Sequence, residues 1–420
     1  MDDVHDPYAA LRIRDYRRLL AASVLASLGR EMQSIAIGWE LYERTNSALA
    51  LGYVGLVQFL PVLFLSLPAG HVVDRYSRKG VLGAAQALST VCSVGLAAIS
   101  AWQAPVPLVY LCLLGTGIGQ AFSFPARWAL LPLVIPEAAL TNAVTWNSSG
   151  WQVAAMAGPA LGGIVIAVTG GAVTAYLLTA ASGLLVVWLV FSLRPREVMK
   201  TREKLSLASL LAGVQFVRRA PLIMAAITLD LFAVLFGGAT ALLPIYARDI
   251  LAIGPTGLGW LRAAPSIGAF FMAIGLAHRP PLRQAGRALL WAVTGFGAAT
   301  IAFGLSRRPW FSFLMLAVTG ALDNISIVVR GTLVQVLTPD EMRGRVSAVN
   351  SIFIVSSNEL GAFESGLVAD WLGAMASVVL GGVGTILVVL AVVYRWPALL
   401  RLGALNTLRP AKTADDRQEP

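Results

Sequence analysis

Long apolar runs, separated by short polar stretches, follow one another along nearly the whole chain. An α-helix needs about 20 mainly apolar residues to cross a bilayer. Twelve runs approach or exceed this length, at Leu19–Tyr42, Ala48–Ala69, Gly80–Ala101, Pro107–Phe124, Asn142–Thr169, Val173–Leu193, Leu222–Tyr246, Thr256–Leu276, Ala288–Leu305, Trp310–Val329, Val346–Ala369 and Ala374–Tyr394. The pattern predicts an all-α membrane protein with twelve transmembrane helices.

The composition agrees with this pattern. Hydrophobic residues make up 57% of the chain and charged residues 13%, whereas soluble domains contain roughly 45–50% and 25%. The first apolar run follows a polar, acidic start and is too long for the core of a cleavable signal peptide. We therefore expect it to remain in the protein.

Basic residues alternate between successive loops. The net charge is +10, and all but six of the 32 Lys and Arg residues lie in the terminal segments or at every second loop. This positive-inside pattern places both termini in the cytoplasm, as expected for a bacterial inner-membrane protein. It also argues against a nucleic-acid partner.

One stretch of the chain occurs twice. Thr116–Gly163 aligned with Thr319–Gly366 gives ten identities in 48 positions without a gap. Identical residues include Arg127 and Arg330, Pro136 and Pro339, Asn147 and Asn350, and Gly158 and Gly361. The repeat predicts two pseudo-symmetric six-helix bundles.

The runs and the repeat together define a domain plan. We expect a cytoplasmic N-terminal segment at 1–18, bundles at 19–193 and 222–394, a basic cytoplasmic linker at 194–221 and a cytoplasmic tail at 395–420 with a disordered end. Residues 205–217 of the linker have the pattern of an amphipathic helix lying on the membrane surface.

The loop after the second run carries a charged motif. Its residues, in the order Gly-x-x-x-Asp-Arg-x-x-Arg-Lys, are Gly70, Asp74, Arg75, Arg78 and Lys79. The motif resembles the signature of the major facilitator superfamily between its second and third helices. Gly70 would permit a close helix crossing, and a helix amino terminus or a guanidinium could hold Asp74. The resemblance implies a conformational latch; the alternative is an ordinary basic turn.

A second motif lies in the fifth run. Gly158, Pro159, Gly162 and Gly163 resemble the Gly-Pro-x-x-Gly-Gly motif of antiporters in this superfamily. Pro159 would bend the helix, and the glycines would let another helix pack against the bend. The resemblance implies export; the alternative is a kinked helix with a structural role only.

Other segments are similar to one bacterial branch, the enterobactin-exporter-like secretion transporters. They are Leu41–Thr45, Pro136–Ala143 leading into Asn147–Ser148, and Arg343–Val346. That branch has an Asp soon after the glycine of its first helix, whereas here Gly29 is followed by Arg30 and Glu31.

Charged residues inside the runs are candidates for proton coupling, because each costs about 2.5–3.5 kcal/mol at the bilayer centre unless it is solvated or paired. They are Glu31, Arg30, Asp230, Glu364, Glu359 and Asp323. Our first hypothesis assigns the proton to Glu31, then to Asp230 or Glu364, with Arg30 as a competing cation. The alternative is a fixed pair of Arg and acid that locks helices together. Arg127 and Arg330 lie at the inner ends of their runs, where we expect them to act as anchors.

Several polar and aromatic side chains could line a substrate path. They are Gln33, Trp39, Gln58, Trp151 and Arg262; for the tryptophans the alternative is an interfacial belt. We expect no metal site, no cofactor and no catalytic residues. Neither a P-loop nor a Ser/His/Asp set occurs, which argues against ATP-driven pumping and hydrolysis.

These observations predict a secondary active transporter. We expect a monomer that exports a small amphipathic compound, such as a siderophore or drug, against proton entry by alternating access. Its partners would be this substrate and the lipid bilayer. The alternatives are uptake or facilitated passage, and a membrane scaffold or sensor without transport.

Overall fold

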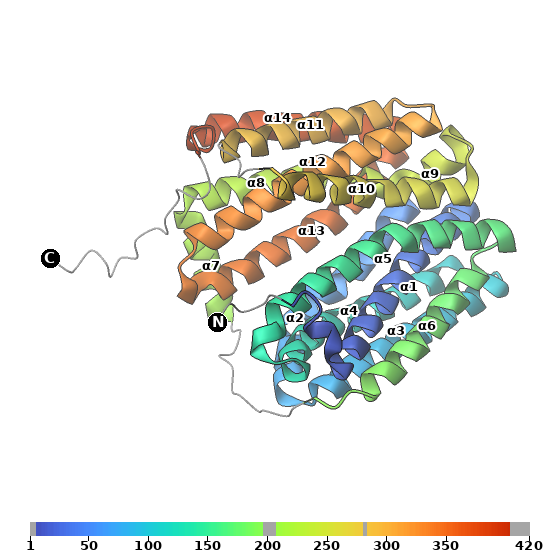
Figure 1. Cartoon of the computed structure of the whole chain (residues 1–420). Coiled ribbons are helices and arrows are strands. Elements are labelled where there is room, and N and C mark those ends of the chain that lie inside the picture. The colour runs from blue at the N-terminus through green and yellow to red at the C-terminus, as the bar shows by residue number, and fades with distance from the viewer. Residues whose placement is uncertain (1–5, 196–206, 280–283, 404–420) are drawn as a thin grey trace. The chain divides into compact units, whose positions relative to one another are not determined.

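The computed structural model describes residues 6–195, 207–279 and 284–403, and all regular secondary structure within these ranges is helical (Figure 1). The chain divides into two compact units. Among the described residues, unit 1 comprises 6–46, 56–195 and 252–263, and unit 2 comprises 47–55, 207–251, 264–279 and 284–403. The central part of the predicted basic linker, 196–206, and the tail from 404 onward lie outside the described residues.

Six long helices come first in the chain. They are α1 (Arg14–Thr45), α2 (Ala48–Arg75), α3 (Arg78–Ala101), α4 (Val106–Val134), α5 (Leu140–Thr169) and α6 (Val173–Phe191), with short 3₁₀ turns at Ala10–Arg12 and Glu137–Ala139. The first turns of α2 belong to unit 2 and the rest of these helices to unit 1.

The second part begins with a short helix, α7 (Leu207–Arg219), at the position of the expected amphipathic segment. The helices that follow are α8 (Pro221–Phe236), α9 (Leu243–Ile245), α10 (Gly254–Ala277), α11 (Ala285–Gly304), α12 (Pro309–Leu337), α13 (Asp340–Leu372) and α14 (Ala374–Arg395), with a 3₁₀ turn at Pro397–Leu399. The first turns of α10 belong to unit 1.

Ten helical segments among the described residues are long and apolar enough to cross a membrane. The chain is therefore a multi-pass, all-helical membrane protein. The predicted runs Leu19–Tyr42 and Val346–Ala369 also lie within helices, α1 and α13, but these two helices are more polar and are not among the ten.

The run Leu222–Tyr246 was predicted as one continuous helix, and the structure divides it. Helix α8 ends at Phe236, and a 3₁₀ turn (Ala239–Leu242), α9 and a π-helical turn (Tyr246–Ile250) follow. Gly237 and Gly238 weaken helical continuity at the break, and Pro244 lacks the N–H that a continuing helix would use. A hydropathy profile does not detect such a break, because Gly237, Gly238 and Pro244 are all apolar or small.

Polar contacts join the helices inside unit 1. The Tyr16 hydroxyl of α1 donates to the Ala143 carbonyl of α5 at 2.7 Å, and both residues are buried. The Thr179 hydroxyl of α6 donates to the Gly29 carbonyl of α1 at 3.1 Å. Helix α1 is thus held between α5 and α6, and α3 packs on both α4 and α6.

The repeated glycines make equivalent helix crossings. A Cβ atom on Gly158 of α5 would lie 3.0 Å from the Leu28 carbonyl oxygen of α1. A Cβ atom on Gly361 of α13 would lie 2.7 Å from the Leu235 carbonyl oxygen of α8. The two sequence copies therefore use the same glycine to bring two backbones together, α5 onto α1 and α13 onto α8.

This crossing predicts a difference between two glycines of α13. Gly361→Ala is expected to destabilise the protein by about 1–3 kcal/mol, because the new methyl group meets backbone atoms of α8. Gly344→Ala is the control, since within the described chain nothing outside its own helical turn lies within 4 Å of its Cβ position and Ala favours the helix by roughly 1 kcal/mol. The thermal midpoint of each purified variant in detergent measures the effect. Equal midpoints for the two variants would contradict the crossing.

Candidate functional site: an acidic pocket in the second unit

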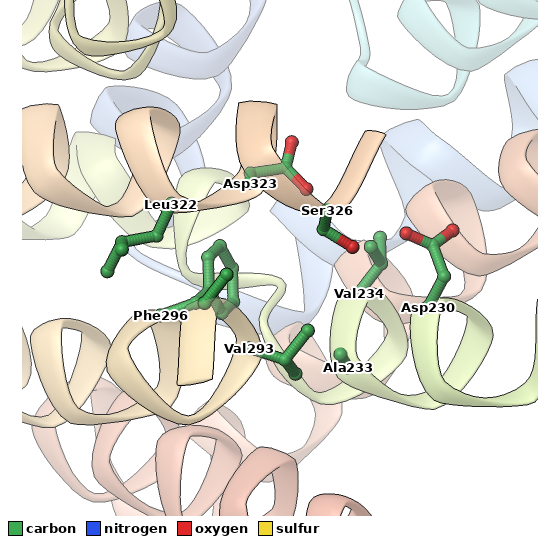
Figure 2. Close-up of a pocket in the computed structure, with 9 residues that line it drawn as sticks. Asp230, Ala233, Val234, Val293, Phe296, Leu322, Asp323 and Ser326 are labelled. Atoms are coloured by element: carbon green, nitrogen blue, oxygen red, sulfur yellow. The ribbon is translucent and has the colours of Figure 1, made fainter. Parts of the chain in front are cut away.

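A small pocket, with room for about one water molecule, lies between three helices of unit 2. Its lining is mostly apolar, with the polar side chains of Asp230, Asp323 and Ser326 among Val and Phe residues (Figure 2). Asp230 comes from α8, Phe296 from α11, and Asp323 and Ser326 from α12. Two carboxylates thus meet an apolar pocket within segments that can span a membrane.

Helical spacing places these groups. Asp323, Ser326 and Arg330 follow one another at intervals of three and four residues, so they share one face of α12. On α8, Asp230 and Val234 are likewise one turn apart and line the same pocket. These two faces, one on α8 and one on α12, pack toward each other. The sequence of either helix alone does not specify this pairing.

Asp230 and Arg330 form an ion pair between α8 and α12. Each side chain is only 7% exposed. Burying two charges is costly unless they pair, and removing either one would leave an uncompensated charge. The structure therefore ties the anchoring residue Arg330 to one of the candidate acids.

Asp323 has a different environment. It lines the pocket beside Ser326, and the described residues provide no ion pair or hydrogen bond to its carboxylate. The next residue, Asn324, has a buried side-chain oxygen that also lacks a hydrogen-bond partner within the described part of the chain. Asp323 is thus an acid of the spanning helices to which the described part of the chain supplies no fixed cation.

Glu31, the first candidate for proton coupling in the sequence analysis, lies in unit 1. Its carboxylate is 3.9 Å from the guanidinium of Arg30, and the two side chains are 23% and 45% exposed. The backbone of α5 at Gly158 packs against the Cβ of Glu31. Arg127 of α4 is close enough to Arg30 for the two cations to repel. This cluster of three charges has a net positive charge, whereas Asp230, Asp323 and Arg330 have a net negative one.

The other two candidate acids lie on α13. Glu364 accepts a hydrogen bond of 3.4 Å from the hydroxyl of its neighbour Ser365. Glu359 is part-buried and has an interaction partner. Neither residue lines the pocket that holds Asp230 and Asp323.

The antiporter-like glycines pack as the motif suggested. Gly158 and Gly162 of α5 face the backbone of α1, where a Cβ on Gly162 would lie 3.0 Å from the Met32 carbonyl oxygen. Pro159 and Gly163 are buried in the same helix.

The charged loop motif has one feature that differs from expectation. No atom of the described chain lies within 4 Å of a Cβ built on Gly70, so the structure shows no close packing at this glycine and the crossing stays a prediction. Asp74 and Arg75 are exposed at the end of α2, and Arg78 begins α3. Lys79 donates to the Leu193 carbonyl at 3.1 Å, which connects α3 to the end of α6.

The candidates for a substrate path occupy varied environments. Gln33 is buried, and its side-chain oxygen accepts a hydrogen bond of 2.6 Å from Ser93. Trp39, Gln58 and Arg262 are part-buried, while Trp151 is 53% exposed. The hydrogen bond from Ser93 gives Gln33 a contact between α1 and α3 in addition to any role in a path.

Sequence reasoning missed a buried charged network on α1. Glu40 accepts hydrogen bonds from the Tyr176 hydroxyl at 2.9 Å and from Arg44 at 3.2 Å. Arg44 also donates to the Ala104 carbonyl of the loop between α3 and α4. The spacing of four residues between Glu40 and Arg44 could have indicated the pair, but not the tyrosine on α6.

Comparisons with known proteins agree with these features. The profile of the transmembrane secretion effector family of the major facilitator superfamily matches residues 5–410. The multidrug efflux pump Tap of Mycolicibacterium fortuitum is 27% identical over 375 residues, covering 86% of this chain and 90% of its own. The enterobactin exporter EntS of Escherichia coli (strain SMS-3-5 / SECEC) is 24% identical over 403 residues, covering 96% and 95%.

Solved transporters share the fold at low identity. A bacterial homologue of the lysosomal transporter Spinster, in an inward-facing and unoccupied conformation, superimposes with a TM-score of 0.70 at 15% identity, over 92% of this chain and 96% of its own. A bacterial homologue of the iron transporter ferroportin gives 0.69 at 16% identity, over 90% and 98%. The resemblance in the loop motif and in the branch-specific segments is thus confirmed. The chain belongs to the transmembrane secretion effector family of the major facilitator superfamily, and it is a membrane transporter rather than an enzyme.

Proposed function

We propose that this transporter exports a small amphipathic organic compound in exchange for protons. It would work by alternating access, with twelve spans in two pseudo-symmetric six-helix bundles and both termini in the cytoplasm. The relatives named as a multidrug efflux pump and as an enterobactin exporter support the direction of transport. They also support a drug or a siderophore as the class of substrate.

The observation that carries the proton coupling is the acidic pocket of unit 2. An ionised acid inside a membrane helix is costly unless water or a cation compensates it. Asp230 has its cation in Arg330, whereas Asp323 faces the pocket without one among the described residues. When water leaves the pocket, a proton on Asp323 would replace the lost solvation.

This difference in surroundings suggests different roles for the two acids. Asp230 would be a positioning residue, because its pair with Arg330 holds α8 against α12. Asp323 would take up a proton when the pocket opens to one side of the membrane and release it on the other. Glu31 is the second candidate, but Arg30 lies near its carboxylate.

The chemistry of each unit fits an amphipathic substrate. The charged cluster of unit 1 has a net positive charge through Arg30 and Arg127, and the pocket of unit 2 combines acids with Phe296 and aliphatic side chains. Arginines can bind acidic or hydroxyl-rich groups of a ligand, and apolar side chains can bind the rings of a ligand.

A flux experiment tests the proposal. Purified protein is reconstituted into liposomes, a pH gradient is imposed, and a panel of fluorescent cationic dyes and catecholate siderophores is screened for accumulation. The proposal expects accumulation that vanishes when an ionophore collapses the gradient. Accumulation that ignores the gradient would favour facilitated passage. The absence of flux for every compound would favour a scaffold or sensor.

A further inference from the structure

A basic cleft lies at the end of helix α6 in unit 1. It offers about 910 Å³ of open space. We call it the α6-end cleft, and its lining residues are Arg14, Asp15, Arg18, Lys79, Phe191, Ser192, Leu193 and Arg194. Three helices contribute to it, α1 with its first turns, α3 with Lys79, and α6 with its last residue. None of these residues lines the acidic pocket of unit 2.

The charges in the cleft do not balance. Four of the lining residues are cations and one, Asp15, is an acid. Asp15 lies 3.4 Å from Arg18 and pairs with it. The cleft therefore carries a surplus of three positive charges from its own side chains.

Two of the cations also bind the end of α6. Arg18 donates to the Ser192 carbonyl at 2.6 Å, and Lys79 donates to the carbonyls of Leu193 and Phe191 at 3.1 and 3.4 Å. These contacts satisfy carbonyls that the helix end leaves open, and cations near a helix carboxyl terminus are favourable. Carbonyls are neutral, so the helix end offsets only about half an elementary charge.

The other two cations have no such role. Arg14 and Arg194 are exposed at the cleft, and the described residues supply no acid or carbonyl partner for either. Both guanidinium groups are thus available to an anion, and a guanidinium binds phosphate oxygens through paired N–H groups.

The surroundings of the cleft indicate where that anion comes from. Helix α6 is long and apolar enough to span a membrane, and Trp188 and Phe191 near its end are 62% and 53% exposed. Exposed aromatic residues at a helix end mark the level of the lipid headgroups. About one turn earlier in α6, away from the cleft, Leu184 and Leu185 are 64% and 44% exposed and offer an apolar surface for acyl chains.

We propose that the α6-end cleft binds the phosphate of an anionic phospholipid headgroup, with Arg14 and Arg194 contacting the phosphate and the lipid chains lying along α6. Basic pockets between membrane helices are suited to anionic headgroups. A lipid fits better than a free phosphate ion because the cleft continues into the apolar face of α6.

Native mass spectrometry of the purified full-length protein tests this site. Phosphatidylglycerol and phosphatidylcholine of equal chain length are titrated separately into the detergent solution, and bound lipid is counted. We expect preferential retention of phosphatidylglycerol. The double variant R14Q/R194Q is expected to weaken its binding about 30-fold, since each basic residue near the headgroups contributes roughly a factor of five. It leaves intact Arg18 and Lys79, which hold the end of α6.

The matched control removes two cations outside the cleft. Arg12 pairs with Asp6 at 3.1 Å and Arg17 is exposed, and neither lines the cleft. The control R12Q/R17Q should therefore bind phosphatidylglycerol like the wild type. Equal losses in the two double variants, or none in R14Q/R194Q, would overturn the proposal. Displacement of the lipid by millimolar inorganic phosphate would assign the cleft to a free anion and overturn the lipid assignment. Because the assay measures binding without transport, it is independent of whether the chain exchanges protons for drugs.

Discussion

The variant Asp323→Asn is expected to fold and to lose all transport driven by a pH gradient. Asparagine keeps the size of the side chain but cannot exchange a proton. In liposomes, accumulation by this variant should fall to the level without protein. Exchange of labelled for unlabelled substrate, with no gradient imposed, should persist, because that reaction needs the substrate path but no net proton transfer. The two fluxes measured on one preparation separate coupling from binding.

Two further variants make this result specific. Asp370→Asn neutralises an exposed acid of α13 that does not line the pocket, and it should transport like the wild type. Glu31→Gln neutralises the competing candidate and should keep a response to the gradient. If Glu31→Gln loses the response while Asp323→Asn keeps it, the proton belongs to unit 1 and our assignment is wrong.

The variant Asp230→Asn is expected to destabilise the protein strongly. It leaves Arg330 without its partner at a position where the side chain is 7% exposed. Breaking a buried pair in this way typically costs about 3–5 kcal/mol. The thermal midpoint in detergent and the yield of folded protein should both fall. Asp6→Asn is the control, because its pair with Arg12 is exposed and such pairs contribute at most about 1 kcal/mol.

A second substitution should reverse most of this loss. In Asp230→Asn with Arg330→Met, neither member of the buried pair is charged, and replacing a buried pair by neutral groups is often close to neutral in stability. The double variant should therefore be more stable than Asp230→Asn alone. If both single and double variants unfold at the temperature of the wild type, the pair does not hold α8 against α12.

The sequence was sufficient for the class of fold because hydropathy acts over long, continuous segments. Each of the twelve apolar runs lies largely in helix, and the resemblance in the loop after the second run identified the superfamily. The sequence did not reveal the break after Phe236, since Gly237 and Gly238 change backbone freedom without changing hydropathy. The open surroundings of Gly70 were not predictable either, because a glycine in a sequence does not show whether another helix packs against it.

The site was only partly predictable, for a related reason. Spacing alone put Asp323, Ser326 and Arg330 on one face of α12. It could not indicate that Asp230, one hundred residues earlier in the chain, is the acid that pairs with Arg330. Partners on different helices depend on which faces pack together, and many apolar faces are equally suitable. The same holds for Ser93, which donates to Gln33, and for Tyr176, which donates to Glu40.

Proton movement caused by the substrate itself tests the central proposal most directly. Liposomes containing the protein, a trapped pH-sensitive dye and a transported compound are diluted into compound-free buffer of the same pH. Exchange of substrate for protons predicts that the lumen acidifies as the compound leaves, in either orientation of the protein, and that Asp323→Asn abolishes the acidification. Departure of the compound with an unchanged or rising luminal pH would contradict proton-coupled export.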